Sequence, residues 1–385
     1  MIRELQNTLS IERKPKLKNP HEQEQNISVF VHLAFNKNAA LWRKSRAEGK
    51  LVGINDETPY GYGRAETMGC TIQFPTHHNM GYFTKAARLL LRGVFGFDFV
   101  HAWLCRNEFR KADIIWTHTE SQFLSVAATL LLTKQKTKLL GQVVWLMDRW
   151  ENLTIFHKWL YRKLLARVDI LTFLSIDNYK KAKYLFPRAA LEIVPFGIPS
   201  ETRMMVRTFT GKNLNVLALG NDMHRDWETL VKAVAGEQNI TLTILSGSAP
   251  RYLSQYGTNI KINVAKNNNE LLQALQNADV MCVPLKPNLH ASGITVIQEA
   301  VLSGIPVIAT GTGGLDLYFS ENEITYVPVG DILALRSALH GIIQNPAMAK
   351  SRAVAAQARM ADPECSGAQA YISRHVEISR NLLKA

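Results

Sequence analysis

The sequence is poor in cysteine, and its cysteines do not form any common metal-binding spacing. The 385 residues contain only Cys70, Cys105, Cys282 and Cys365. No two of them make a CxxC pair, so the usual spacing of a structural zinc site is missing. Widely spaced single cysteines are typical of reduced thiols in a cytosolic protein. We therefore expect reduced thiols and no structural zinc.

Long apolar runs are missing too. No stretch reaches the roughly 18 to 20 consecutive apolar residues that a membrane span needs. Residues 1–25 are polar throughout, unlike a secretory signal, and we interpret them as a flexible basic leader. Hydrophobic residues make up 46% of the chain and charged residues 20%. This composition and a length of 385 residues predict a globular chain with two domains.

Acidic residues are scarce only in the first half of the chain. Residues 1–200 hold 29 Lys and Arg against 17 Asp and Glu, whereas residues 201–385 hold 16 against 15. A basic half of this kind faces either nucleic acid or an anionic membrane surface. The chain contains no RNP1, GXXG or zinc-finger pattern. The asymmetry therefore favours a membrane surface.

Residues 278–310 have the pattern of a strand, a helix and a second strand. Residues 278–284 and 305–310 are short apolar runs suited to buried parallel strands, and residues 294–303 lie between them as a helix. Ser292 is placed to cap this helix, and Gly293 allows a ligand to approach the backbone. The free N–H groups and the positive dipole end at such a helix start favour a phosphate. Glu299, about 1.5 turns later, is placed to accept the two hydroxyls of a ribose.

This stretch resembles the donor-binding motif of GT-B glycosyltransferases, and of the GT4-like group in particular. The second Glu of that motif corresponds to Glu299, and its Gly-x-Pro-Val and Gly-Gly segments correspond to Gly304, Pro306, Val307, Gly313 and Gly314. Where the family has its first Glu, this chain has Ala291. His290 or Asn288 then remains to contact the donor sugar. The alternative is an ordinary helix-and-strand unit of a doubly wound sheet.

The resemblance implies an α/β fold of the GT-B class, in which two Rossmann-like domains with doubly wound parallel sheets face a cleft. We assign residues 26–199 to an N-terminal acceptor and membrane-facing domain and residues 200–213 to a linker. Residues 214–367 then form the C-terminal nucleotide-sugar domain. Residues 368–385 are expected to form a helix that crosses back to the N-terminal domain. The run Pro195-Phe196-Gly197-Ile198-Pro199 resembles the segment that closes the first domain of such proteins.

The resemblance also implies a set of donor-binding residues in the second domain. Arg225, and secondarily Lys286, would neutralise the charge that grows on a leaving diphosphate. The alternative for Arg225 is an ion pair with Asp222 or Asp226 at a helix start. The full predicted donor set is Gly220, Asn221, Arg225, Lys286, His290, Ser292, Gly293, Ile294, Thr295 and Glu299.

Candidate catalytic residues follow strands of the first domain, because ligands of open α/β sheets bind beyond the carboxyl ends of the strands. Asp148 follows a predicted strand over residues 142–147, and His118 and Glu120 follow another over residues 113–117. Asp148 lies where similar enzymes, including the inverting glucuronosyltransferase of xanthan assembly, have an Asp base. That match favours inversion, whereas the GT4-like group retains configuration, so both outcomes stay open. Asp148 is otherwise structural, paired with Arg149, and His118 and Glu120 are otherwise local caps.

Two further stretches of the first domain have a binding character. Residues 81–111 place six Lys and Arg beside many Leu and aromatic residues, as an interfacial membrane helix requires. Residues 157–167 extend the same basic character. The alternative is a pair of amphipathic helices that cover the sheet and expose solvated cations. The glycine- and tyrosine-rich residues 56–69 either border a cleft or form a packed turn.

Together these features predict a glycosyltransferase that moves a sugar from a nucleotide-diphosphate sugar to a saccharide on a polyprenyl diphosphate carrier. We expect no cofactor, and no metal because the chain has no Asp-x-Asp motif. A UDP-sugar is the expected donor rather than a GDP-sugar. The expected location is the cytoplasmic face of the plasma membrane, in exopolysaccharide or similar glycan assembly, with no nucleic-acid partner. The alternatives are a nucleotide-sugar 2-epimerase and a non-catalytic scaffold of a glycan-assembly complex.

Overall fold

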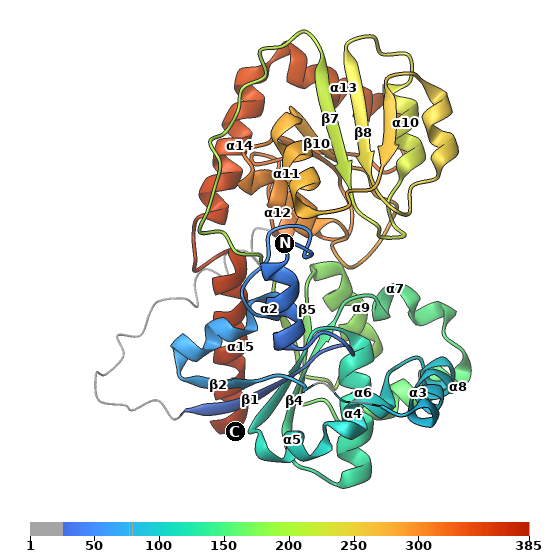
Figure 1. The fold of residues 1–385 in the computed structure, drawn as a ribbon, viewed down its shortest axis with the longest axis vertical. Coiled ribbons are helices and arrows are strands. Elements are labelled where there is room, and N and C mark those ends of the chain that lie inside the picture. The colour runs from blue at the N-terminus through green and yellow to red at the C-terminus, as the bar shows by residue number, and fades with distance from the viewer. Residues whose placement is uncertain (1–25, 77, 79, 385) are drawn as a thin grey trace.

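The structure is a computed structural model, and it describes residues 26–76, 78 and 80–384. Two α/β domains lie one above the other, each built around its own sheet (Figure 1). The chain forms the first domain, crosses to the second along residues 194–213, and returns with its last helix. The predicted GT-B class of two Rossmann-like parallel-sheet domains is confirmed by this architecture.

The first sheet has six parallel strands in the order β2-β1-β3-β4-β5-β6. Successive residues of its inner strands belong to two separate apolar clusters, because side chains alternate between the two faces of a sheet. Both faces are therefore buried, as in other parallel sheets. The strands are β1 (Ile27–His32), β2 (Cys70–Gln73), β3 (Ile114–Thr117), β4 (Lys138–Val143), β5 (Ile170–Phe173) and β6 (Leu191–Ile193).

Helices cover both faces of this sheet and carry most of its connections. Several begin with a side-chain cap, such as Asn38 before α2 and Ser175 before α9. The helical segments are α2 (Ala39–Ala47), η1 (Pro59–Met68), α3 (Tyr82–Phe95), α4 (Phe99–Leu104), α5 (Arg106–Lys111), α6 (Glu120–Thr133), α7 (Leu146–Arg149), η2 (Trp150–Asn152), α8 (Ile155–Leu165) and α9 (Ile176–Leu185).

The second sheet also has six parallel strands, in the order β12-β11-β10-β7-β8-β9. Its topology reverses beside β7 and β10, so the loops that follow these two strands meet at the switch point where ligands of such sheets bind. The strands are β7 (Leu214–Leu219), β8 (Ile240–Leu245), β9 (Ile260–Asn263), β10 (Val280–Val283), β11 (Val307–Thr310) and β12 (Thr325–Val327).

The last helix returns to the first domain and joins its core. Tyr371, Ile372 and Val376 of this helix pack with Trp116 of β3, whose indole N–H donates to the hydroxyl of Ser379 at 2.8 Å. The helical segments of this part of the chain are α10 (Trp227–Val234), η3 (Arg251–Tyr256), α11 (Asn268–Asn277), α12 (Ile294–Leu302), η4 (Leu315–Leu317), α13 (Ile332–Gln344), α14 (Pro346–Met360) and α15 (Gly367–Lys384).

One predicted strand is misplaced, and the shift bears on the candidate base. We expected a strand over residues 142–147, but β4 ends at Val143. The Glu120 carboxylate accepts hydrogen bonds from the backbone amides of Val144 and Trp145, and this turns the apolar run away from the sheet. Asp148 therefore lies in the short helix α7 rather than at a strand end.

The stretch 81–111 forms three helices, α3, α4 and α5, rather than the pair considered as the alternative to an interfacial membrane helix. Gly96 ends α3 in a left-handed conformation, and the Asp98 side chain then caps α4. Within the described residues, no helix has the length and apolar character to cross a bilayer.

Candidate functional site

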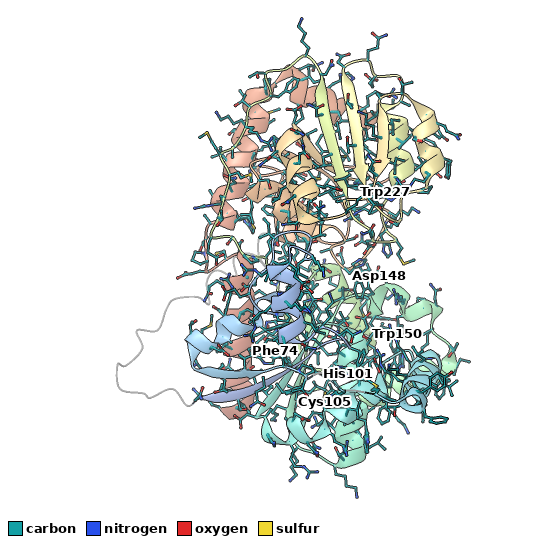
Figure 2. All side chains as sticks on the ribbon, viewed as in Figure 1. Phe74, His101, Cys105, Asp148, Trp150 and Trp227 are labelled. Atoms are coloured by element: carbon teal, nitrogen blue, oxygen red, sulfur yellow. The ribbon has the colours of Figure 1, made fainter. Side chains whose placement is uncertain are left out.

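The loops after β7 and β10 meet at the edge of the second domain that faces the first. They comprise residues 220–226 and 284–293, and the backbones of Arg225 and Leu285 pair across them as an isolated bridge. Asp148 lies opposite, at the side of the first domain that faces the second (Figure 2). Predicted residues from both domains therefore meet at this edge.

Arg225 lies between the two loops and is buried. Its Nε donates to the carbonyl oxygen of Leu219 at 3.0 Å, and its Nη1 donates to the Ser292 hydroxyl at 3.3 Å. The guanidinium packs so closely on Gly220 and Gly293 that a Cβ there would lie 2.5 and 2.8 Å from its nitrogens. Burial lowers the pKa of Arg225 to about 10, so the side chain is cationic at neutral pH. The structure therefore brings Gly220, Arg225, Ser292 and Gly293 together.

The loop before α12 differs in detail from the expected cap. Gly293, with φ of 84°, occupies the N-cap position, and no side chain caps this helix. The Ser292 hydroxyl instead accepts from Arg225, so the prediction that Ser292 caps α12 is wrong. Asn288 shapes the loop by accepting from the Ser292 amide at 3.1 Å. Ala291, at the position of the missing Glu, is buried with φ of 53°.

The remaining members of the predicted donor set lie around this loop. Asn221 accepts from the amide of Gly247 at 2.7 Å and so holds the loop after β8. Ile294 is buried, whereas the side chains of Lys286 and Thr295 are exposed. Thr295 and Lys286 are therefore free to meet a ligand, while Asn221 and Ile294 shape the loops.

His290 joins the two domains through two carboxylates. Its Nδ1 lies 2.8 Å from Oδ2 of Asp148 in the first domain, and its Nε2 lies 3.3 Å from Oδ2 of Asp222 in the second. The other oxygen of Asp148 accepts from the amide of Leu289 at 2.8 Å. Asp148 therefore pairs with His290 and Leu289 rather than with Arg149, the partner we had considered.

The electrostatics of this triad favour a charged imidazole. Burial alone would lower the pKa of His290, but its hydrogen bonds to Asp148 and Asp222 outweigh burial and raise it. Burial likewise opposes ionisation of Asp222, yet the hydrogen bonds from His290 and from His224 bring its pKa well below the usual range. The two carboxylates therefore favour the charged form of His290.

Glu299 contacts the first domain. Its carboxylate accepts from the amide of Ile54 at 3.1 Å, and the neighbouring amide of Gly53 donates to Asn268 of α11 at 2.9 Å. Burial raises the pKa of Glu299 to about 7. A ribose bound at Glu299 would have to replace or join the Ile54 amide.

Two cavities border Glu299 and share Ile54 and Asn55 as lining residues. The larger, of about 570 Å³, extends between the linker and α11 and is lined by Leu271 and Leu275. The smaller, of about 200 Å³, lies by Thr295 and is lined by Tyr60 from the first domain. Tyr60 belongs to the stretch 56–69, which therefore borders a cavity between the domains.

His118 lies in an aromatic cluster and away from the His290 triad's hydrogen bonds. Its ring stacks on Tyr60 with centroids 3.6 Å apart, and its Nδ1 lies 3.0 Å from the hydroxyl of Tyr62. That hydroxyl also bonds to Tyr371 of α15 at 2.8 Å. Burial lowers the pKa of His118 to about 3, so the imidazole is neutral. Glu120, by contrast, is engaged with the backbone at the turn before α7.

Sequence reasoning missed three residues that the structure brings to this region. Asp222 was considered only as a partner of Arg225, although it follows β7 and the strand-end rule could have selected it. Asn268 and Ile54 carry no such signal, because one opens a helix after β9 and the other lies in an irregular segment of the other domain. Their meeting at Glu299 depends on how the domains pack.

Comparison with known proteins places these residues in context. Residues 215–345 match a family model described as glycosyl transferases group 1. No curated protein matches the chain. The fold is similar to sucrose-phosphate synthase from Thermosynechococcus elongatus, with a TM-score of 0.69 at 17% identity over 93% of this chain and 99% of the other. It is also similar to Anabaena HepE in complex with UDP and glucose, with a TM-score of 0.62 at 14% identity over 92% and 99%.

A third similar structure is the UDP-forming alpha,alpha-trehalose-phosphate synthase from Burkholderia vietnamiensis. Its TM-score is 0.56 at 13% identity, over 85% of this chain and 80% of that one. At these identities the structural likenesses establish the fold. The family match covers the domain that carries Arg225, His290 and Glu299.

Proposed function

We propose that this chain, a GT-B glycosyltransferase with a group 1 domain at residues 215–345, transfers a sugar from a UDP-sugar to a lipid-linked saccharide at a membrane surface. The observation that carries the proposal is the meeting of Arg225, Gly220 and Gly293 at the start of α12, with Asp148 of the first domain close by through His290. This arrangement offers a cationic, backbone-lined place for a diphosphate, with a carboxylate on the far side.

The donor diphosphate would bind at the two glycines. The first amides of α12 lack helical partners, and the helix dipole adds positive charge at that end. Arg225 adds a full charge, so this end of the helix can stabilise a leaving diphosphate without calling on a metal. Lys286 is exposed beside the same loop and would add a second cation.

The nucleoside would bind towards Glu299. Its carboxylate can accept both ribose hydroxyls, and the apolar side chains of Leu271 and Leu275 line the adjoining cavity. Uracil is our choice of base because the HepE complexes contain UDP or UDP-glucose and the trehalose-phosphate synthase is described as UDP-forming. As the nucleotide binds, the ribose hydroxyls would replace the Ile54 amide as hydrogen-bond donors to Glu299.

Asp148 would take the proton of the acceptor hydroxyl. A carboxylate that accepts this proton while the glycosyl bond forms acts as a general base. In the present arrangement both oxygens of Asp148 are occupied, one by the Leu289 amide and one by His290. The acceptor hydroxyl would replace one of these contacts.

The acceptor would reach the first domain from a membrane. Helix α3 buries none of its residues, and with α8 it forms an exposed apolar face. We call this the α3–α8 face; it comprises Tyr82, Phe83, Leu89, Leu90 and Val94 of α3 and Ile155, Phe156 and Trp159 of α8. Lys85 and Arg92 of α3 and Lys158 and Lys163 of α8 lie on the same two helices.

An apolar face among cations is suited to the boundary between acyl chains and anionic headgroups. A polyprenyl diphosphate carrier presents its saccharide at that boundary. The proposed location is therefore the inner surface of the plasma membrane, during the assembly of an exopolysaccharide or another cell-surface glycan.

Thermal unfolding with UDP, GDP, ADP and TDP tests the donor half of the proposal. A ligand at 100 times its dissociation constant adds about 2.7 kcal/mol of stability. UDP should stabilise the wild type most, and should stabilise Glu299→Gln much less. The Gln side chain can still accept from the Ile54 amide, so the variant keeps the contact between the domains. If no nucleotide raises the melting temperature of the wild type, a non-catalytic scaffold explains the fold better.

Binding to vesicles tests the acceptor half separately. Anionic vesicles should retain the protein and neutral vesicles should not. Transfer of radiolabelled sugar from UDP-sugars to acceptors in an extract of cellular lipids then tests the reaction itself. UDP binding without vesicle binding would favour a soluble acceptor, or an epimerase that needs no acceptor.

A further inference from the structure

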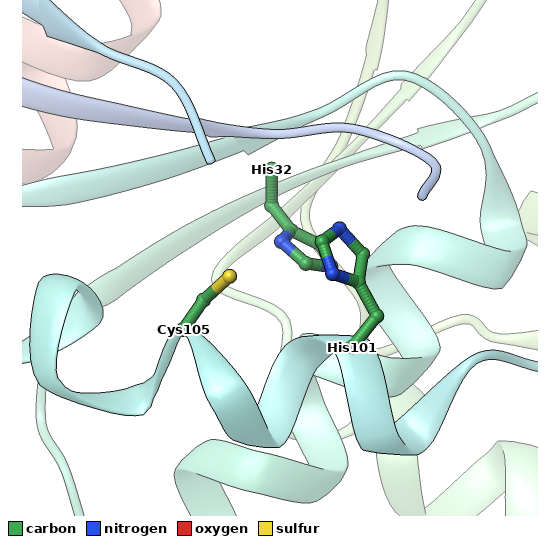
Figure 3. A group of neighbouring side chains, drawn as sticks. All are labelled: His32, His101 and Cys105. Carbon is green, nitrogen blue, oxygen red and sulfur yellow. The ribbon is translucent and has the colours of Figure 1, made fainter. Parts of the chain in front are cut away.

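We propose that His32, His101 and Cys105 form a buried zinc site in the first domain, with His78 as the fourth ligand. One potential ligand atom from each of the first three residues lies within 4.8 Å of the other two. Their side chains converge from strand β1 and from the helical segment α4–α5 (Figure 3). The proposed metal site is separate from the site of sugar transfer and does not depend on that proposal.

The histidine nitrogens of this group are buried without hydrogen-bond partners. Nδ1 of His32 and Nδ1 of His101 are both enclosed, and neither has a partner among the described residues. A buried polar nitrogen without a partner loses its hydrogen bonds to water and gains none in return. Two such atoms beside one thiol are unfavourable in the absence of a ligand, whereas a cation between them would satisfy both.

The orientation of His101 is fixed by its other nitrogen. Nε2 of His101 lies 3.1 Å from the carbonyl oxygen of Leu33, which can only accept, so Nε2 carries the proton. The lone pair is therefore on Nδ1, the atom without a partner. Metal-binding histidines have this arrangement, in which a second acceptor holds the protonated nitrogen and directs the other to the metal.

The local chain supplies the remaining geometry. His101 and Cys105 are four residues apart along α4 and its end, so their side chains lie on one face of the helical segment. His78, in the segment that leads to α3, has its Nε2 3.6 Å from Sγ of Cys105. The set is then three imidazoles and one thiol, which zinc binds in a tetrahedral arrangement.

The Cys105 thiol would bind zinc as the thiolate, so its proton must leave when the metal binds. Binding of Zn²⁺ would form a Zn–S bond and release that proton to solvent.

The site would be structural. His32, His101 and Cys105 are at most 3% exposed, so no open position faces a substrate. Zinc would fasten the end of β1 to α4 and to the segment before α3. Because α3 buries no residue of its own, this fastening would hold the α3–α8 face in place.

The direct test uses zinc and cobalt with the full-length chain. Protein purified and dialysed without chelator should contain about one zinc per chain. After removal of zinc, added Co²⁺ should produce the absorption of tetrahedral cobalt together with a thiolate-to-cobalt charge-transfer band. Cys105→Ala should lose that band and bind zinc more than about 100-fold more weakly. Even the loss of a group that only hydrogen-bonds to a ligand lowers metal affinity about 10–100-fold.

Cys282→Ala is the matched control, because Cys282 is equally buried but lies in β10 of the second domain. It should retain the zinc and the cobalt band. If Cys105→Ala fails to fold, the cobalt spectrum of the wild type and of Cys282→Ala still decides. A wild-type spectrum without a thiolate band, or zinc binding equal in Cys105→Ala and wild type, would overturn the proposal.

Discussion

The two domains offer a ligand different kinds of structure. The second domain offers tight loops, in which Gly220 and Gly293 have positive φ and lie against Arg225. The first offers α3 and α8, which project large apolar side chains outward, and a cluster of stacked rings around His118. The loops of the second domain are closely packed around backbone groups, whereas the α3–α8 face of the first domain is open to solvent.

This difference indicates which positions can be substituted without loss of the fold. A side chain at Gly293 would collide with Arg225 and Val283, so the donor loops tolerate little variation. A residue on the outer side of α3 contacts few others, so substitutions there are cheap for stability. The proposed donor site is therefore constrained in sequence, whereas the α3–α8 face is free to vary.

Asp148→Asn tests whether the first domain supplies a catalytic group. Loss of the carboxylate should reduce the rate of transfer about 10²–10⁴-fold, the usual contribution of a general base. UDP affinity should stay near that of the wild type, because Asp148 lies on the side of the acceptor. The measurements are transfer rate and UDP affinity for each variant.

Asp222→Asn is the matched control on the second domain, since Asp222 binds the same His290 from the opposite side. It removes one of the two carboxylates that favour the charged form of His290 but leaves the proposed base in place. The rate of transfer should therefore fall less than in Asp148→Asn. Equal rates for wild type and Asp148→Asn would remove Asp148 from the chemistry.

Arg225→Met tests the proposed role of the second domain in binding the donor. The substitution keeps most of the side-chain volume but removes the charge at the start of α12 and leaves the Leu219 carbonyl without its donor. UDP affinity should fall about 100-fold, since a hydrogen bond to a charged group contributes about 1.5–3 kcal/mol. Isothermal titration with UDP measures the change.

Arg207→Met separates this effect from a general loss of stability. Arg207 also donates to backbone carbonyls of the second domain, at Leu275 and Gln276, but lies away from the two donor loops. Both variants should unfold at lower denaturant concentration, and only Arg225→Met should lose UDP. A similar loss of UDP in both would show that Arg225 acts through the fold alone.

Membrane binding by the α3–α8 face is tested by Leu89→Ser with Leu90→Ser. These two leucines of α3 are 63% and 69% exposed, so the unfolding free energy should hardly change. Binding to anionic vesicles should weaken about 10- to 100-fold, because two large apolar side chains no longer enter the boundary. Co-sedimentation with vesicles gives the affinity.

Leu131→Ser with Leu132→Ser is the control pair, exposed in the same domain at the end of α6. It should leave vesicle binding unchanged. If both pairs lose binding equally, the attraction is not specific to the α3–α8 face.

The sequence predicted the strands well because each is a short apolar run bounded by polar residues. The predicted strands over residues 113–117, 278–284 and 305–310 correspond to β3, β10 and β11, and each end lies within two residues of the predicted one. The exception is β4, where an apolar run continues beyond the strand. Nothing local distinguishes Leu146 from a strand residue; the turn depends on Glu120, 26 positions earlier, reaching the backbone.

The site was predictable where its residues lie in one motif and not where it joins segments. Arg225, Gly293 and Glu299 were selected from spacing and resemblance within the second domain. The pairing of Asp148 with His290 and of Glu299 with Ile54 crosses between the domains, and no local pattern contains it. The expectation of no structural zinc rested on cysteine spacing alone, and the proposed metal site draws three of its four ligands from histidines.

The smallest expected effect concerns Glu299, which contacts the first domain through the Ile54 amide. Burial raises the pKa of Glu299 to about 7, above its value in the unfolded chain, so the folded protein holds this proton more tightly. The unfolded state therefore binds fewer protons between about pH 4.5 and 7, and stability must fall as pH rises through that window. Glu299 should thus cost about 1 kcal/mol of unfolding free energy between pH 6 and 8.

Glu299→Gln cannot ionise and should lack this part of the pH dependence. Urea unfolding of both proteins at pH 6, 7 and 8 measures the difference. Over the same window UDP affinity should rise with pH in the wild type, because an ionised carboxylate accepts both ribose hydroxyls, and should stay flat in the variant. Parallel pH profiles for the two proteins would mean that Glu299 is already ionised at pH 6. Its contact with Ile54 would then hold the domains together with the carboxylate charged, and a ribose would have to displace that contact at every pH.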